Sequence, residues 1–128
     1  MKQEITAKQV GDLGEQIAVR YLRRHGYWIR ERNWRFGKDE IDVIATTLRD
    51  VVFVEVKTRR YSAEELDLAP PPGTAVHAHK QQHTRACARN YLATHPLRKQ
   101  PRMDVIEVWL SKDEKPRLLR LHHIKAAY

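Results

Sequence analysis

The sequence predicts one α+β (α/β) domain in which helices flank a central mixed sheet. Its 128 residues fit a single ordinary domain, residues 1–128. Apolar residues recur at helical spacing near the start and again at about residues 75–94, and β-branched and aromatic runs lie between and after these segments. The resulting order is helix, three strands, helix and strand, with a further strand at the end.

The first helix is predicted from Thr6, which can cap it, to Gly26, which can end it. Gly11 and Gly14 would let this helix approach the sheet closely. Its apolar stripe comprises Val10, Leu13, Ile17, Ala18, Tyr21 and Leu22.

Three strands follow this helix. Residues 27–34 mix aromatic and β-branched residues with arginine, and Gly37 suggests a turn after them. Residues 40–46 and 51–58 are apolar runs separated by four residues, which is typical of a hairpin. We expect this hairpin at the centre of the sheet.

The second half begins with an expected mobile loop at about residues 60–74, where three consecutive prolines make continued sheet or helix unfavourable. A helix is expected over 75–94, then strands over 103–110 and 118–124. The buried stripe of that helix should comprise Thr84, Cys87, Ala88, Tyr91 and Leu92.

Charge and cysteine content narrow the function. The formal net charge is +8, which favours a polyanionic partner such as nucleic acid. A lone cysteine excludes an intramolecular disulfide and fits a reducing compartment. The chain start lacks an apolar signal core and no run of residues is long enough to span a bilayer, so we expect a cytoplasmic protein without a membrane partner.

A charged pair interrupts the apolar 51–58 strand. Alternation puts Glu55 and Lys57 on one face, and a hairpin centred after Leu48 puts Asp42 opposite Glu55. Two carboxylates with water suit Mg²⁺ or Mn²⁺ against a phosphodiester, with Lys57 orienting the attacking water or stabilising the phosphorane. The simpler alternative is a cross-strand salt bridge.

Further candidates surround this group. Glu15 borders the buried stripe of the first helix, where it can act as an acid–base group or a metal ligand, or be an ordinary surface charge. Arg35, Arg59, Lys80 and Gln81 are candidate nucleic-acid contacts, although exposed charges are commonly just solvated. Arginines around Trp28 and Trp34 have the same two interpretations. His79 and His83 have a zinc-compatible spacing but no evident third ligand, so we favour surface histidines.

Several motifs resemble those of the YraN-like family of uncharacterised bacterial proteins, and more widely the PD-(D/E)XK nucleases, which include restriction-type endonucleases and archaeal Holliday-junction resolvases. The resemblance covers nearly the whole chain. The matching segments are GDLGE at 11–15, NWR at 33–35, DEID at 39–42, FVEVKTR at 53–59, KQ at 80–81, YL at 91–92, RMDV at 102–105 and HIKA at 123–126.

This resemblance implies a restriction-endonuclease-like α-β-β-β-α-β core and magnesium-dependent cleavage of nucleic acid. It makes Asp42 and Glu55 metal ligands, Lys57 the catalytic lysine and Glu15 the helix-borne acid of the resolvase-like branch. Two positions depart from the family pattern. Asp39 replaces a glycine, so the turn before the strand can differ, and Met103 replaces a phenylalanine, a conservative packing change.

The leading hypothesis is therefore a metal-dependent DNA endonuclease, acting on branched or structured DNA. The alternatives are a nucleic-acid-binding module that keeps the fold without cleavage, and a dimeric scaffold whose carboxylates bridge to arginines. Analogy with resolvases, which cut two strands symmetrically, is compatible with a homodimer.

Overall fold

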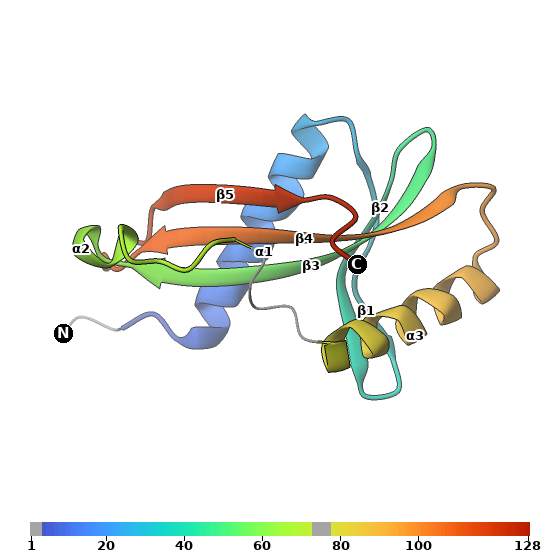
Figure 1. The fold of residues 1–128 in the computed structure, drawn as a ribbon, viewed down its shortest axis with the longest axis horizontal. Helices are drawn as coiled ribbons and strands as arrows, with labels where there is room; N and C mark the ends of the chain where they lie inside the picture. The colour runs from blue at the N-terminus through green and yellow to red at the C-terminus, as the bar shows by residue number, and fades with distance from the viewer. Residues whose placement is uncertain (1–3, 73–77) are drawn as a thin grey trace.

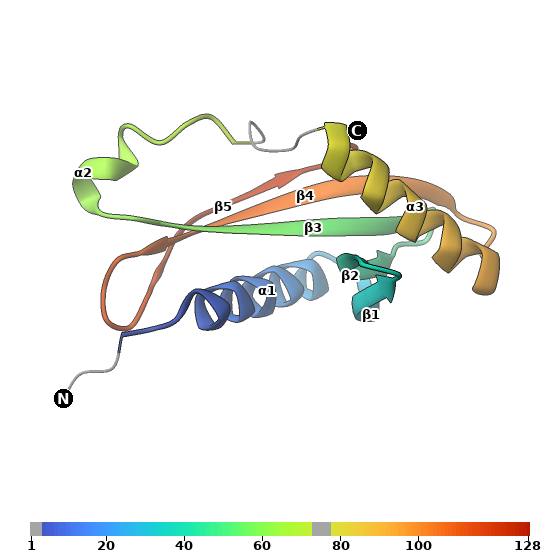
Figure 2. The ribbon, with the colours of Figure 1, turned by 90° about the horizontal axis from the view of Figure 1, so that it is seen from below.

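A five-stranded mixed sheet forms the middle of the molecule, with α1 against one face and α3 against the other (Figures 1 and 2). The computed structural model describes residues 4–72 and 78–128. The elements are α1 (Ala7–Arg24), β1 (Trp28–Phe36), β2 (Asp39–Thr46), β3 (Asp50–Tyr61), α2 (Ala63–Leu66), α3 (Ala78–Thr94), β4 (Gln100–Ser111) and β5 (Leu118–Ile124).

The sheet confirms the predicted mixed α+β architecture. Its strand order is β1-β2-β3-β4-β5, and neighbouring strands are antiparallel except β3 and β4. The parallel β3–β4 pairing runs without interruption from Asp50↔Gln100 to Tyr61↔Ser111, with α3 in the connection between the two strands. The expected hairpin of β2 and β3 is present, and β3 lies at the centre.

The first helix begins and ends as its sequence predicts. Thr6 caps α1: its hydroxyl accepts from the Gln9 N–H at 3.1 Å, and the Gln9 side chain accepts from the Thr6 N–H at 2.9 Å. After the helix, Gly26 has φ +85°, a conformation that favours glycine. Buried α1 residues face the sheet in a cluster of Ala18, Val19, Leu22, Val43, Ala45, Val52, Val54, Ile106 and Val108.

The opposite face of the sheet is covered by α3. Cys87 and Tyr91 are buried there, as predicted, and Trp34 packs edge-on against the Tyr91 ring with centroids 5.2 Å apart. This second cluster comprises Ile41, Ile44, Val51, Phe53, Cys87, Ala88, Tyr91 and Met103. Of the helix expected over 75–94, residues 75–77 lie outside the described part of the chain.

The prediction of a loop at about residues 60–74 is wrong for the first part of this segment. Strand β3 continues to Tyr61 because β4 offers it a pairing partner as far as Ser111. Ser62 then starts the short helix α2, since its hydroxyl accepts from the Glu65 N–H and the Glu65 carboxylate accepts from the Ser62 N–H. No helix in the described parts of the chain is long and apolar enough to cross a membrane.

A buried polar network attaches the chain end to the sheet. The carboxylate of Asp104 on β4 accepts two hydrogen bonds from Arg102 and lies 2.7 Å from His123 Nε2. His123 Nδ1 lies 3.0 Å from the hydroxyl of Tyr21 on α1. Hydrogen bonding to His123 and Arg102 keeps the pKa of Asp104 below its usual value despite burial. These side chains satisfy one another, which indicates a structural role.

The two glycines of α1 differ in their packing, which corrects one expectation. A Cβ on Gly14 would lie 1.9 Å from Thr58 Oγ1 and 2.9 Å from Thr58 Cβ. A Cβ on Gly11 would meet nothing within 4 Å, so the close approach of helix and sheet depends on Gly14 alone of the pair.

We predict opposite effects for alanine at these two positions. Gly14→Ala forces α1 away from β3 and should lower the free energy of unfolding by about 1–3 kcal/mol. Gly11→Ala improves helix propensity in open space and should raise it by about 0.5–1 kcal/mol. Urea unfolding followed by circular dichroism measures both. Equal effects of the two substitutions would contradict the packing difference.

Candidate active site

The antiparallel pairing of β2 with β3 stops at the predicted carboxylates. The paired residues run from Thr46↔Val51 to Val43↔Val54, the register that the hairpin symmetry predicts. The next pair would be Asp42 and Glu55, but the described ladder ends before it. Figure 1 shows β1 and β2 crossing β3 steeply. The neighbouring part of β3 therefore has an edge that β2 does not cover.

Asp42 uses the backbone that this ladder end exposes. Its Oδ2 accepts a hydrogen bond from the Val56 N–H at 2.8 Å, which fixes the carboxylate against β3. Burial raises the pKa of Asp42 from 3.8 to about 6, the nearby Glu55 adds to the increase, and the Val56 N–H opposes it. Asp42 is thus ionised near neutral pH at a free-energy cost.

Glu55 has one paired oxygen and one unpaired oxygen. Its side chain is 6% exposed, and Oε1 lies 3.3 Å from Lys57 Nζ and 3.6 Å from Lys80 Nζ. Oε2 is buried, and no described residue donates a hydrogen bond to it. A buried carboxylate oxygen without a partner is costly, so this atom is available for a cation or water.

Glu15 reaches the same region from α1. Asn33, in the left-handed region at φ 54°, places its side-chain amide against Glu15 Oε1 and Glu40 Oε1; with the amide nitrogen assigned to this side it donates to them at 3.0 Å and 3.2 Å. Burial raises the pKa of Glu15 from 4.5 to about 7, Asp42 raises it further and Arg32 opposes the increase. A carboxylate with this pKa exchanges protons near neutral pH.

A pocket opens beside the carboxylates of Glu15 and Asp42. It has a volume of about 400 Å³ and lies between the N-terminal half of α1 and the uncovered part of β3. Gly11 forms part of its wall, so the missing side chain enlarges the pocket. The lining residues are Ile5, Ala7, Val10, Gly11, Glu15, Asp42, Val56, Thr58 and Arg60.

The carboxylate oxygens at this site suit a hard divalent cation that keeps water and phosphate ligands, rather than a metal held by protein ligands alone. Among the described residues, no three His, Cys, Asp or Glu side chains gather closely enough to hold a metal. Asp42 and Glu55 offer carboxylate oxygens, one of them the buried Oε2 without a donor. Mg²⁺ is commonly bound by one or two carboxylates together with water and phosphate oxygens, so these residues fit it.

The predicted basic residues have different surroundings. Lys80 of α3 reaches Glu55, as its place one turn before the buried stripe suggests. Arg35 forms an ion pair with Glu40 at 3.2 Å, at the outer side of the site. Arg59 is half-buried on β3, two residues beyond Lys57. Gln81 is half-buried on α3, and no contact between described residues joins it to the carboxylates.

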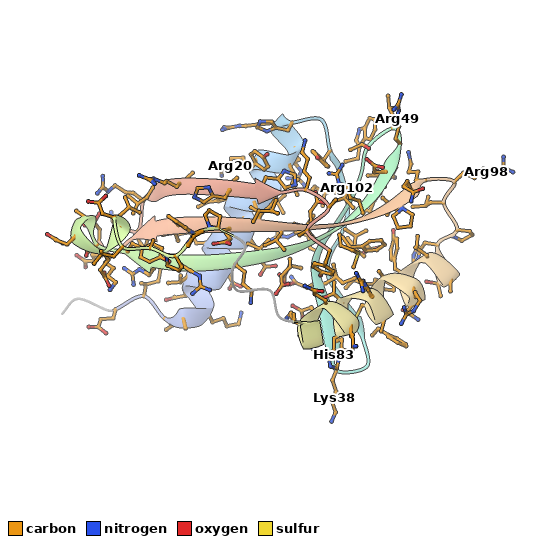
Figure 3. All side chains as sticks on the ribbon, viewed as in Figure 1. Arg20, Lys38, Arg49, His83, Arg98 and Arg102 are labelled. Carbon is orange, nitrogen blue, oxygen red and sulfur yellow. The ribbon has the colours of Figure 1, made fainter. Side chains whose placement is uncertain are left out.

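The histidine pair does not form a described zinc site. His83 Nδ1 lies 2.8 Å from the carboxylate of Asp39, whereas the side chain of His79 lies outside the described residues. Asp39 and Glu40 both have partners of their own, His83 for the first and Arg35 for the second. Figure 3 shows His83 beside Lys38 at the lower edge of the molecule.

Sequence reasoning missed the contacts that hold the carboxylates. The Val56 N–H could not be assigned because the end of a ladder leaves no pattern in side-chain types. The bridging role of Asn33 had a weak signal, since asparagine is among the residues that tolerate a left-handed backbone. Glu107, buried on β4 and in register with Lys57, was also missed; Trp109 Nε1 donates to its Oε1 at 3.1 Å.

Comparison with known proteins identifies the family. Residues 14–108 match the family described as "Uncharacterised protein family UPF0102". The chain is 41% identical over 126 residues to UPF0102 protein TTE1452 of Caldanaerobacter subterraneus subsp. tengcongensis, covering 98% of each chain. It is also 39% identical over 118 residues to a UPF0102 protein of Porphyromonas gingivalis, covering 92% of this chain and 82% of that one. The expected YraN-like membership is thereby confirmed, and the protein belongs to the UPF0102 family.

Proposed function

We propose that this protein is a metal-dependent endonuclease that hydrolyses phosphodiester bonds in DNA, acting on branched or structured DNA. The observation that carries the proposal is Glu55, whose Oε1 lies near two lysines while its buried Oε2 has no described donor. The carboxylate of Asp42, which accepts a hydrogen bond from the Val56 N–H, lies beside Glu55. The motif resemblance to PD-(D/E)XK nucleases supports the same conclusion.

The residues divide the chemistry between them. Asp42 and Glu55 would hold Mg²⁺ or Mn²⁺, which would neutralise phosphate charge and make water a better nucleophile. Glu15, with its pKa near 7, accepts the proton of the attacking water. Lys57 orients that water or stabilises the charge that develops as the new P–O bond forms and the bond to the leaving oxygen breaks.

The energetics of the carboxylates also support the proposal. A salt bridge with only a structural role would leave each carboxylate oxygen paired, as in the Asp104 network. Asp42 and Glu15 instead have pKa values raised by burial and by mutual repulsion, so their ionised forms destabilise the fold. Such strain at a pocket is typical of functional sites.

We predict metal-dependent cleavage that requires two residues of the cluster. Wild-type protein should cut at least one substrate among labelled duplex, single-stranded, flap and four-way-junction DNA and RNA, in Mg²⁺ or Mn²⁺ and not in EDTA. Lys57→Ala and Asp42→Ala should each lower the rate by at least about 100-fold, because the first removes a cation at the phosphate and the second removes a ligand of the proposed metal. Gel assays of initial rates provide the measurement.

The matched control is Lys115→Ala, which removes an exposed lysine after β4 and should leave the rate unchanged. If wild-type protein binds every substrate but cuts none, the non-catalytic binding module becomes the better hypothesis. Equal cutting by wild type and both cluster variants would remove the catalytic assignment. Absence of both binding and cutting would favour the scaffold.

We also predict a stability gain from neutralising Asp42. Folding raises the pKa of this carboxyl to about 6, so the folded protein binds the proton more tightly than the unfolded chain. The ionised form therefore lowers stability above about pH 6, and the penalty fades as the pH falls toward 4. In EDTA, Asp42→Asn should be more stable than wild type by about 1–2 kcal/mol at pH 8 and by about half as much at pH 5.

Urea unfolding at the two pH values measures this difference. Asp67→Asn, at an exposed position, is the control and should change stability at pH 8 less than Asp42→Asn does. The electrostatic account would be contradicted if the stability gain of Asp42→Asn over wild type were smaller at pH 8 than at pH 5.

A further inference from the structure

Five arginines line a groove between α1 and β1, four of them in one pocket and Arg30 in the pocket beside it. The groove has a pocket of about 370 Å³ lined by Gln16, Val19, Arg20, Arg23, Arg24 and Arg32. A second pocket of about 540 Å³ shares Arg23 with the first and also contains Trp28 in its wall. We call these two pockets together the arginine groove. Figure 3 shows Arg20 on its α1 side.

The arginines of this groove lack close acidic partners among the described residues. All five are exposed, and no ion pair between described residues joins any of them to a carboxylate. The helix dipole accounts for Arg23 and Arg24, which lie in the last turn of α1. It does not account for Arg20, further from the helix end, or for Arg32 on β1. Mutual repulsion makes this grouping unfavourable without an anionic partner.

An exposed aromatic residue, Trp28, belongs to the wall of the second pocket. Trp28 is 55% exposed, whereas Trp34 on the same strand is half-buried against Tyr91 and His95. Packing therefore explains Trp34 and leaves Trp28 without a comparable role. Cationic grooves with an exposed aromatic face bind single-stranded nucleic acid, because phosphates contact the cations and unpaired bases stack on the ring.

The arginine groove begins where the carboxylate site ends. Gln16 in its wall directly follows Glu15, and the charge of Arg32 acts on the Glu15 carboxylate. A strand bound at the carboxylate site therefore has the arginine groove as a neighbouring surface along α1. The other end of the carboxylate site is bordered by Lys57 and Lys80.

We propose that the arginine groove binds a single-stranded arm of the DNA substrate, with phosphates on Arg20, Arg23, Arg24 and Arg32 and an unpaired base on Trp28. The proposal rests on the nuclease function proposed above and specifies its substrate as DNA with a single-stranded arm next to the cleavage point. A continuous duplex offers no base face to Trp28.

Equilibrium binding in EDTA tests the charge contribution without any cleavage. Fluorescence anisotropy of a labelled single-stranded oligonucleotide should show Kd raised about tenfold or more by the double variant Arg20→Gln/Arg23→Gln. The magnitude of the slope of log Kd against log salt should fall by about 1.4, that is about 0.7 for each phosphate that the variant no longer neutralises. Thermal melting checks that the variant is folded.

The matched control is Arg49→Gln/Arg98→Gln, which removes the same charge from two exposed arginines that do not line the arginine groove, one in the β2–β3 turn and one between α3 and β4 (Figure 3). This control should change Kd less than threefold. Equal weakening by both double variants would show that only net charge matters and would overturn the assigned groove.

Trp28→Ala tests base stacking. It should raise Kd for the single strand at least fivefold and leave Kd for a blunt duplex within twofold. An equal effect on the two DNAs, or none on either, would contradict the stacking assignment. Binding to anionic phosphatidylserine vesicles is measured as a separate experiment. Binding to vesicles that depends on the arginine groove, without binding to DNA, would overturn the proposal in favour of a membrane surface.

These measurements separate the two proposals. Groove-dependent binding of single strands together with no cleavage of any substrate would refute the nuclease function and the substrate role built on it, while retaining the arm-binding surface. Cleavage that depends on Lys57, with unchanged binding in the groove variants, would refute the arginine groove alone.

Discussion

The hydrogen bond from the Val56 N–H to Asp42 Oδ2 joins the fold to the candidate site. Had the β2–β3 ladder continued, we would expect the Val56 N–H to pair with β2 and Asp42 to be an ordinary cross-strand neighbour of Glu55. The ladder ends at Val43↔Val54 instead, and the exposed N–H is satisfied by a carboxylate. The same end uncovers the edge of β3 along which the pocket lies.

Asp104 and Glu55 are both buried carboxylates, but their oxygens differ in the hydrogen-bond partners that they have. Asp104 is buried, but both its oxygens accept hydrogen bonds from Arg102, with His123 and the Ala126 N–H as further partners. Glu55 is similarly buried and keeps one oxygen without a described donor. Since an unsatisfied buried oxygen destabilises the fold, its retention is better explained by a ligand than by packing.

Much of the fold and part of the site could be predicted from the sequence. Period-two alternation and the symmetry of a short hairpin were enough to bring Asp42 toward Glu55, because both follow from local geometry. The continuation of β3 to Tyr61 depends on pairing with β4, a strand distant in the sequence, which local composition does not encode. Likewise Gly11 and Gly14 look alike in sequence, and only the position of Thr58 separates them.

The aromatic residues show the same limit. Trp28 and Trp34 lie in similar arginine-rich surroundings in the sequence, yet one is exposed beside the arginine groove and the other packs against Tyr91. Which of them is exposed depends on where α3 crosses the sheet, a tertiary feature. The sequence could therefore suggest that an aromatic ring in this strand contacts nucleic acid, but it could not show which of the two tryptophans is exposed.

One packing contact sets the positions of both proposed surfaces. Helix α1 supplies Glu15 to the carboxylate site and Arg20, Arg23 and Arg24 to the arginine groove. Its separation from β3 is limited where Gly14 meets Thr58, one residue before Glu15. Because a helix moves as a rigid element, a shift at this contact would move the carboxylate and the arginines together relative to Asp42. The distance between Asp42 and the arginine groove thus depends on the contact between Gly14 and Thr58.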